Sequence, residues 1–337
     1  MKKYFLILAV LCMTAFWSCE DSDLPFEDGS ELPGGDGNGD DNGDGNGDDN
    51  GDDNGDDADD NGNDSNGDGE NDDIYIPEDM EDAFPDPIFR AYVLENFDTD
   101  GDSKISEEEA LKVTQINVSN KHDTPDDEKI TSLEGVHYFT NLTKLNCTSN
   151  QLTSLDVSKN TKLTSLLCYY NRLTSLDVSK NTKLTELKCY SNQLTSLDVS
   201  KNSDLISLSC YSNRLTSLDV SKNTKLQFLF CWSNQLTSLD VSQNSILREF
   251  GCSENKLTTL DLSKNTALAY LDCSCNQLTT LDISKTSIGD TTEPSPLNCV
   301  DNPLKTLYLK TGWSIQDITP NRNPNRIPEQ TEIVFVD

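Results

Sequence analysis

Carboxylate side chains recur at every second position between residues 98 and 102, and another follows at residue 109. Asp98, Asp100 and Asp102 offer oxygen atoms from one short loop, and Glu109 offers two more. Calcium binds six to eight oxygen ligands in proteins, a number that this spacing can supply. We therefore predict a calcium site in this loop. The alternative interpretation is a solvated acidic turn between two helices.

The same loop resembles an EF-hand, whose acidic residues occupy the first, third, fifth and twelfth positions. The resemblance implies that Lys104 contributes its backbone carbonyl, that Ser106 holds a water molecule, and that Glu109 binds through both oxygens. One departure from the pattern is Ser103, which stands where glycine is usual and should strain the turn. Because the loop has no obvious partner hand, the expected role is a structural ion that rigidifies its surroundings.

Helical signals flank the loop on both sides. Asp86 and Pro87 form a helix start, with aspartate as the N-cap and proline at the first helical position. Apolar residues follow at near-helical spacing up to Phe97. The pair Ser106 and Glu109 is typical of a capping box on a second short helix. We therefore predict a small helix–loop–helix cap over residues 83–115.

A 21-residue unit repeats seven times over residues 142–287 and predicts the fold of most of the chain. A fixed period of this length indicates a solenoid, because one copy cannot bury its own apolar face. The period slips after Thr286 and resumes at Leu297, so we place the solenoid at residues 116–309 and a C-terminal cap at 310–337. We expect an irregular first rung at Ile116 and closing strands at 304–309 and 333–336. Cysteine and asparagine return once per copy, at Cys147, Cys168, Cys189, Cys210, Cys231, Cys252 and Cys273 and at Asn150, Asn171, Asn192, Asn213, Asn234, Asn255 and Asn276.

The repeat pattern LxxLxCxxNxLxxLxVxxN resembles a leucine-rich repeat in which cysteine replaces one leucine, as in the cysteine ladders of internalin-type bacterial surface proteins. The resemblance implies a curved solenoid with a parallel β-sheet on its concave face, which binds proteins or other ligands. Alternation along a strand agrees with this fold. Leu145 and Cys147 would face inward, while Lys144, Asn146 and Thr148 would face outward.

Equivalent residues of adjacent copies should stack in columns. We interpret the cysteines as buried free thiols, because parallel side chains about 4.8 Å apart do not meet the geometry of a disulfide. The asparagines should bond backbone groups where the chain turns. The aspartates from Asp156 to Asp282 run beside a lysine column and should form a charge-balanced edge, with a column of bound cations as the alternative.

Aromatic residues gather on the outward strand positions and predict where a ligand binds. Exposed aromatic patches mark interaction sites, although stacking between rungs that merely stabilises the sheet is the alternative. We expect the solenoid to bind a host or bacterial surface protein or to mediate adhesion, with glycan binding as the alternative, and we expect a monomer. The predicted ligand-binding residues are Tyr169, Tyr190, Tyr211, Phe228, Phe230 and Trp232.

Two classes of function are disfavoured. The chain has only two histidines, His122 and His137, and no nucleophile motif or paired acid stands out, so we do not expect an enzyme. Of the 59 acidic residues, 27 lie in residues 20–82, which contain no lysine or arginine. The formal charge of −33 therefore belongs mostly to that segment, and no basic stripe predicts nucleic-acid binding.

The N-terminus predicts export and attachment to a lipid membrane. Lys2 and Lys3 precede a mostly apolar run that ends at Trp17, which predicts a signal peptide over residues 1–18. Ser18-Cys19 resembles the processing site of bacterial lipoproteins. This resemblance implies a lipidated Cys19 and a surface-exposed place on the outer membrane; the alternative is an ordinary cleaved signal. Residues 19–82 should form a disordered acidic tether, with calcium-binding repeats as the alternative.

Overall fold

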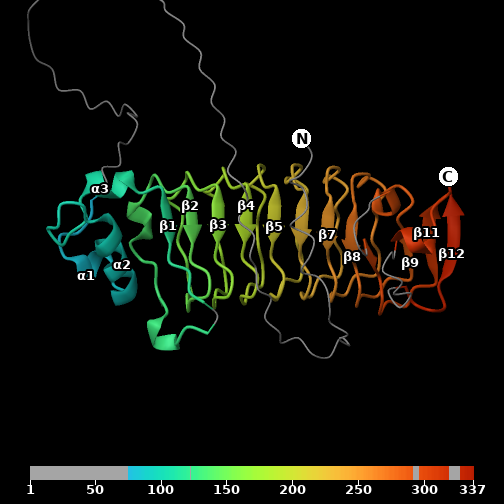
Figure 1. Ribbon diagram of the computed structural model, residues 1–337, viewed down its shortest axis with the longest axis horizontal. Coiled ribbons are helices and arrows are strands. Elements are labelled where there is room, and N and C mark those ends of the chain that lie inside the picture. Colours follow the sequence, from blue (N-terminus) through green and yellow to red (C-terminus); the bar gives the residue numbers. More distant parts are fainter. Residues whose placement is uncertain (1–74, 122, 291–295, 319–326) are drawn as a thin grey trace, which may run out of the picture. The chain divides into compact units, whose positions relative to one another are not determined.

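The structure is a computed structural model that describes residues 75–121, 123–290, 296–318 and 327–337 (Figure 1). The predicted signal peptide, the predicted lipidation site Cys19 and nearly all of the predicted acidic tether lie outside the described residues. Among the residues that are described, no helix is both long and apolar enough to cross a membrane.

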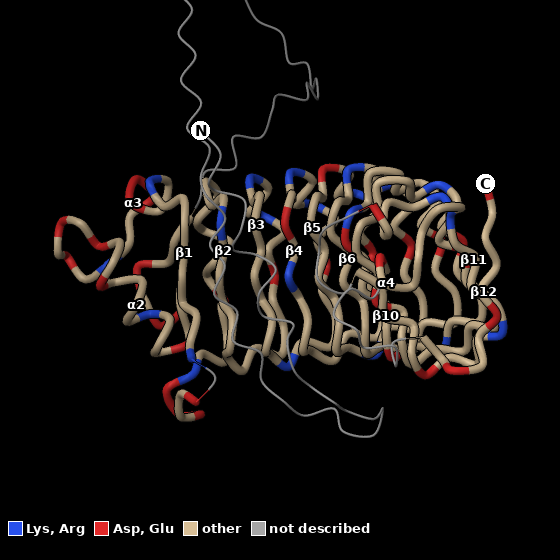
Figure 2. Tube along the Cα trace, turned by 45° about the vertical axis from the view of Figure 1, so that its right-hand side comes forward, with Lys and Arg blue, Asp and Glu red and all other residues tan. Residues whose placement is uncertain are grey.

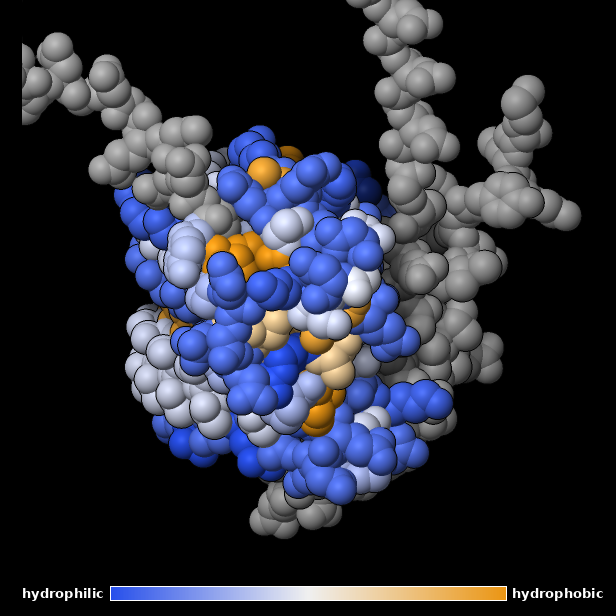
Figure 3. Space-filling view, turned by 90° about the vertical axis from the view of Figure 1, so that its left-hand side faces the viewer, coloured by the Kyte–Doolittle hydropathy of each residue, from blue (hydrophilic) through white to orange (hydrophobic). Residues whose placement is uncertain are grey.

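Three short helices form the N-terminal cap: α1 (Met80–Ala83), α2 (Pro87–Phe97) and α3 (Glu107–Lys112). α1 begins before the predicted boundary at residue 83, because Asp79 caps it by accepting a hydrogen bond from Glu81 N at 2.8 Å. The predicted cap of α2 by Asp86 and the predicted capping box of Ser106 and Glu109 on α3 are both confirmed. Figure 3 looks at this end, where hydrophilic residues cover most of the surface.

Nine parallel strands of the described residues form one sheet in chain order, so that each repeat contributes one rung (Figure 1). At the first junction Ile116 pairs with Leu145, which confirms the predicted irregular first rung, and two 3-10 turns, η1 (Asp126–Glu128) and η2 (Val136–Tyr138), lie between these strands in the chain. The fold is the predicted leucine-rich repeat solenoid. Its strands are β1 (Gln115–Asn117), β2 (Lys144–Asn146), β3 (Ser165–Leu167), β4 (Glu186–Lys188), β5 (Ser207–Ser209), β6 (Phe228–Phe230), β7 (Glu249–Gly251), β8 (Tyr270–Asp272) and β10 (Leu297–Asn298).

In β2 to β8, the middle residue of each strand and the cysteine that follows the strand belong to the core. The middle residues, such as Leu145 and Leu166, are buried, and the ladder cysteines from Cys147 to Cys299 are buried and free. Burial raises the pKa of Cys147, Cys210 and Cys299 to about 12, so these thiols stay protonated. The predicted column of buried free thiols is confirmed.

Two columns of asparagine tie each rung to the rung before it. In the first column, Asn171 donates hydrogen bonds to the backbone carbonyls of Cys147 at 3.0 Å and Cys168 at 3.1 Å. In the second column, Asn181 donates to two backbone carbonyls of the preceding rung. The prediction that the asparagines bond backbone groups is confirmed, and these bonds recur along the solenoid.

The aspartate column caps turns and lies beside lysines, as the charge-balanced interpretation predicts. Asp177 accepts a hydrogen bond from Ser179 N at 2.8 Å, and this bond, with a smaller contribution from Lys180, lowers the pKa of Asp177. Figure 2 shows lysine and arginine positions recurring along one rim of the rungs. The same cap recurs at Asp156, Asp198, Asp219, Asp240, Asp261 and Asp282.

The C-terminal end adds a second sheet. β9 (Thr280–Asp282), β11 (Thr306–Lys310) and β12 (Glu332–Val336) pair in parallel, so the predicted closing strands exist but do not extend the long sheet, which β10 closes by pairing with β8. Two short helices, η3 (Ile288–Asp290) and α4 (Ile315–Ile318), accompany this sheet. Trp313 packs against Gly289 and donates to Asp290 Oδ1 at 2.9 Å, which fixes this cap.

Candidate functional site

The three aspartates of the loop between α2 and α3 lie together, as the sequence predicts. One carboxylate oxygen from each of Asp98, Asp100 and Asp102 lies within 4.8 Å of the other two, and the side chains are exposed or half-exposed. This aspartate trio is the only such cluster of potential metal ligands among the described residues. Because calcium binds carboxylate oxygens, the trio has the chemistry of a cation site.

Backbone hydrogen bonds shape the loop around the aspartate trio. Asp98 accepts from Gly101 N at 2.7 Å and from Ser103 N at 2.9 Å, and Asp102 accepts from Lys104 N at 2.8 Å. Ser103 has a φ of 65°, so the strain predicted for a residue other than glycine is present. The aspartates therefore define the fold of the loop as well as its charge.

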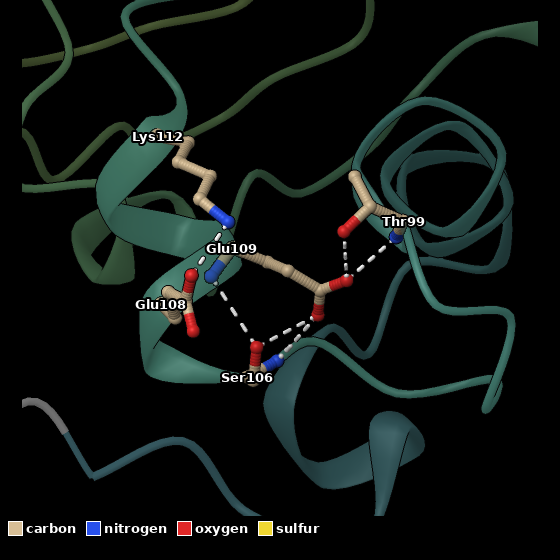
Figure 4. A network of polar contacts seen from close by, with 5 residues as sticks. All are labelled: Thr99, Ser106, Glu108, Glu109 and Lys112. Atoms are coloured by element: carbon tan, nitrogen blue, oxygen red, sulfur yellow. Dashed lines mark hydrogen bonds and ion pairs between the residues drawn. The ribbon is translucent and has the colours of Figure 1, made fainter.

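Glu109 is buried and joins the two ends of the loop (Figure 4). Its Oε1 accepts hydrogen bonds from Thr99 N at 2.6 Å and Thr99 Oγ1 at 2.7 Å. Its Oε2 accepts from Ser106 N at 3.0 Å and Ser106 Oγ at 2.9 Å. Burial opposes ionisation, but the bonds from Ser106 and Thr99 outweigh it and lower the pKa of Glu109 to about 2. Glu109 and Ser106 thus form a hydrogen-bond network and are not members of the aspartate trio.

On the outward side of the strands, called the strand face below, four aromatic residues stack from rung to rung. The ring centroids of Tyr169 and Tyr190 lie 4.2 Å apart, those of Tyr190 and Tyr211 4.1 Å, and those of Tyr211 and Trp232 3.8 Å, with interplanar angles between 11° and 16°. The predicted alternative, stacking between rungs, therefore describes the geometry of this aromatic stack.

One ring of the aromatic stack, that of Tyr190, is buried. Tyr190 is only 4% exposed, whereas Tyr169, Tyr211 and Trp232 are half-exposed. The expectation that all six predicted ligand residues lie on an exposed surface is wrong for Tyr190, because Tyr169 and Tyr211 cover both faces of its ring and Tyr170 packs edge-on against it with centroids 5.5 Å apart. Burial and the adjacent tyrosines raise the pKa of Tyr190.

β6 extends the aromatic surface, and a glycine makes room for it. Phe228 and Phe230 are half-exposed, and the Phe230 ring meets Trp232 edge-on with centroids 5.5 Å apart. A Cβ atom at Gly251, on β7, would lie 2.9 Å from Trp232 and 3.2 Å from Phe230. Sequence reasoning missed Gly251, although glycine inside a strand is itself a signal of close approach by another group.

The described residues hold one histidine, His137. It lies against Tyr138 with ring centroids 4.1 Å apart, and burial lowers its pKa. This is the environment of a packing residue. His122 lies outside the described residues.

Comparison with known proteins supports a leucine-rich repeat of the internalin type. No family model matches the chain. Internalin J of Listeria monocytogenes serotype 4b is 38% identical over 84 residues, which are 25% of this chain and 8% of that protein. The solved functional domain of InlJ from Listeria monocytogenes, which includes a cysteine ladder, is 37% identical with a TM-score of 0.53; the match covers 69% of this chain and 56% of that domain.

Two further solved structures share the fold alone, because their identities are below 25%. Internalin C2 from Listeria monocytogenes is 22% identical with a TM-score of 0.56, and the match covers 69% of this chain and 98% of that one. A leucine-rich repeat protein from Leptospira interrogans is 24% identical with a TM-score of 0.50, and the match covers 68% of this chain and 62% of that one. The chain is therefore a leucine-rich repeat solenoid, and its cysteine ladder is similar to that of the InlJ domain.

Proposed function

We propose that this chain is a cell-surface protein whose solenoid binds a protein partner, or mediates adhesion, through its strand face. The observation that carries this proposal is the aromatic stack, which with Phe228 and Phe230 forms one surface across β3 to β6. Tyrosine, tryptophan and phenylalanine are enriched in protein interfaces and supply much of their binding energy.

A fold-level comparison supports a protein partner. The leucine-rich repeat ectodomain of the receptor kinase GASSHO1/SCHENGEN3 from Arabidopsis thaliana has been solved in complex with Casparian strip integrity factor 2. Its sequence is 18% identical to this chain and its TM-score is 0.50. The comparison supports the use of such a solenoid as a binding surface and does not extend to the identity of the ligand.

Glycan binding through the same aromatic residues is the alternative function. A stacking platform presents the face of an aromatic ring to its ligand. Within the aromatic stack, however, neighbouring ring centroids lie 3.8 to 4.2 Å apart, so the rings cover one another's faces. The ring edges and the tyrosine hydroxyls remain accessible to a ligand. Because a sugar would stack on the face of a ring, this arrangement favours a protein ligand over a sugar.

Arrays of extracellular proteins and of oligosaccharides, probed with the full chain, test this proposal. We expect a protein ligand whose binding survives deglycosylation and is lost when Phe230→Ala and Trp232→Ala are combined. Phe335→Ala is the matched control, because Phe335 is 53% exposed and lies on β12 in the other sheet. Retention of free oligosaccharides alone would support the glycan alternative, and full binding by the double variant would contradict the site.

We also propose that Cys19 carries a lipid that holds the protein on the outer face of the outer membrane. The basic residues Lys2 and Lys3, the apolar run after them and Ser18-Cys19 support this assignment. Two or more acyl chains give stable attachment. Cys19→Ala should move the protein from the membrane fraction to the soluble fraction when cells are fractionated. A variant that stays membrane-bound would show that Cys19 is not the anchor.

The aspartate trio supports a further proposal, calcium binding at the N-terminal cap. Asp98, Asp100 and Asp102 would hold the ion, and the Lys104 carbonyl and a water on Ser106 would complete the predicted set. Glu109 fits its predicted bidentate role less well, because four hydrogen bonds already occupy its two oxygens. When bound, calcium would offset the repulsion among the three carboxylates and stiffen the loop.

Calorimetric titration of residues 75–337, which keep α1 and omit most of the acidic tether, tests calcium binding. We expect one site, and we expect Asp100→Asn with Asp102→Asn to remove it. These two positions are preferable to Asp98 and Glu109, because Asp100 and Asp102 each accept one backbone hydrogen bond, whereas Asp98 accepts two and Glu109 accepts two from backbone and two from hydroxyl groups. Unchanged binding by the double variant would overturn the assignment.

A further inference from the structure

The aromatic stack places three phenols on adjacent rungs, with one of them between the other two. The ring of Tyr190 is nearly parallel to that of Tyr169, at an interplanar angle of 13°, and to that of Tyr211, at 11°. The backbone holds the same order, because Tyr170 N donates to Tyr190 O at 3.2 Å and Ser191 N donates to Tyr211 O at 3.1 Å. Three rings of identical chemistry are therefore kept in contact. We call Tyr169, Tyr190 and Tyr211 the tyrosine triad.

The middle phenol of the tyrosine triad is buried and protonated, whereas the outer two are accessible. Tyr190 is 4% exposed, and burial, together with the adjacent Tyr211 and Tyr169, raises its pKa. The neighbouring hydroxyls offer acceptor oxygens for the phenolic proton. Tyr169 and Tyr211 are half-exposed, so a small oxidant in solution reaches them. The ring contacts then connect Tyr190 to either of these neighbours.

We propose that the tyrosine triad is a site of oxidative cross-linking, at which a one-electron oxidant joins Tyr190 to Tyr169 or Tyr211 through a carbon–carbon bond. Each of the two phenols loses one electron to the oxidant and its hydroxyl proton to solvent, which gives two phenoxyl radicals. The radicals couple at the ring carbons next to the oxygen-bearing carbons. The hydrogen on each coupled carbon then moves to the oxygen, which restores both phenols. The product has lost two hydrogen atoms, and two equivalents of oxidant have each gained one electron.

Stacking favours this coupling over the reactions of an isolated tyrosine. A radical on one phenol already contacts the phenol with which it must couple, so the reaction needs no encounter between separate groups. By contrast, Tyr308 of β11 has Val334 and Asp282 beside it in the register of the second sheet. The new bond joins adjacent rungs covalently and would fix the strand face in one arrangement under oxidising conditions. This modification goes beyond the proposed function and does not depend on it, because it needs no ligand.

Photo-oxidation of the full chain with a ruthenium tris-bipyridine complex and persulfate tests the proposal, because these reagents generate a small one-electron oxidant. Trypsin, which cleaves after lysine and arginine, separates the members of the tyrosine triad. Tyr169, Tyr190 and Tyr211 lie, in that order, on the tryptic peptides 163–172, 189–201 and 202–214. We expect peptide 189–201 to be joined to one of the other two, with the summed mass lowered by that of two hydrogen atoms. The cross-linked chain should run as a monomer on a denaturing gel.

Phenylalanine variants keep each ring of the stack and remove one phenol. Tyr190→Phe should abolish the cross-link, because Tyr169 and Tyr211 lie two strands apart, about 10 Å. Tyr169→Phe and Tyr211→Phe should each leave only the link between Tyr190 and the remaining member of the triad. Tyr170→Phe is the matched control, since Tyr170 meets Tyr169 and Tyr190 edge-on, and its removal should leave the cross-link unchanged.

The double variant Tyr169→Phe with Tyr211→Phe is a second test that leaves the buried phenol of Tyr190 in place, and it should form no cross-link within the chain. The proposal is overturned if the parent chain gives no cross-linked peptide or is cross-linked only to other chains. It is also overturned if Tyr190→Phe keeps the yield of the parent chain, or if the link is mapped to Tyr170 or Tyr308 in place of the tyrosine triad.

Discussion

One carboxylate, that of Asp86, joins the N-terminal helices to the solenoid. Its Oδ1 accepts hydrogen bonds from Ile88 N and Phe89 N, both at 3.0 Å, and so caps α2. Its Oδ2 accepts from Thr131 N and Thr131 Oγ1 at 2.8 Å and from Ser132 N at 3.2 Å. A single side chain therefore couples a helix start to a segment that precedes the second rung.

Asp86→Asn should destabilise the N-terminal cap by about 2 kcal/mol, because an amide accepts fewer and weaker hydrogen bonds than a carboxylate. Burial raises the pKa of Asp86, but the bonds from Phe89, Thr131 and Ser132 outweigh it, and the pKa lies below its ordinary value of 3.8. A lowered pKa contributes stability above that value and loses it as the pH falls further. Urea unfolding between pH 7 and pH 3 measures both effects.

The control for Asp86 is Asp82→Asn, which changes an exposed carboxylate on α1. If Asp86→Asn and Asp82→Asn gave the same urea midpoint at pH 7, the coupling assigned to Asp86 would be refuted. The sequence predicted the half of this arrangement that is local, the cap on α2. The bonds to Thr131 and Ser132 span 45 and 46 residues, and no local pattern reveals them.

At the scale of the element, the first asparagine column, to which Asn171 and Asn213 belong, sets the spacing of the rungs. Asn213 donates to the carbonyls of Cys189, Cys210 and Tyr211 at 3.1 to 3.2 Å and accepts from Leu194 N at 3.0 Å. Asn213→Ala should cost about 3 kcal/mol, since it leaves several backbone groups without partners. Chemical denaturation compares it with Arg214→Ala, an exposed neighbour that should cost little. Equal midpoints would contradict this role.

The burial of the cysteine column predicts that its thiols do not react with alkylating reagents in the folded protein. The ladder thiols are buried, and burial raises the pKa of Cys147, Cys210 and Cys299 to about 12, so almost no thiolate forms near pH 8. Iodoacetamide should leave Cys147, Cys168, Cys189, Cys210, Cys231, Cys252, Cys273 and Cys299 unmodified in the folded protein. The same residues should react in guanidinium chloride. Modification of the folded column, measured by mass spectrometry, would disprove its burial.

Periodicity made the elements predictable but not the orientation of their side chains. A fixed 21-residue spacing places Tyr169, Tyr190 and Tyr211 at equivalent positions and therefore predicts a column. Whether the rings stack face to face depends on their rotamers, which the spacing does not determine. The burial of Tyr190 follows from the rotamers that the neighbouring rings adopt, so the sequence did not reveal it. The aspartate trio was predictable for the opposite reason, because its members lie within one short loop.

At the scale of the whole described unit, stability depends on its ends. Each rung contacts mainly its neighbours, so an uncapped end exposes its core and unfolds first. Trp313 closes the C-terminal end by packing on Gly289, where a Cβ atom would overlap the ring. The second sheet was not predictable, because β9 and β11 pair across an insertion that breaks the 21-residue period.

Gly289→Ala should displace Trp313 and cost about 2 kcal/mol. The loss should be local, so hydrogen exchange ought to accelerate in β9, β11 and β12 while β2 to β5 keep their protection. Gly101→Ala is unsuitable as a control because Gly101 has a positive φ, and Ala269→Gly, just before β8 in the long sheet, serves better. Uniform acceleration along the whole sheet would contradict a local cap.

The identical register of successive rungs has a consequence for the history of the gene. Each rung offers the next the same strand pairing and the same asparagine bonds. A recombination event that removes or adds 21 residues within 142–287 therefore leaves every junction intact. A change whose length is not a multiple of 21 residues moves leucines to the surface. The number of repeats can therefore change during evolution while the two end caps stay the same. We expect a chain that lacks one 21-residue repeat to fold into the same solenoid with one strand fewer on its strand face.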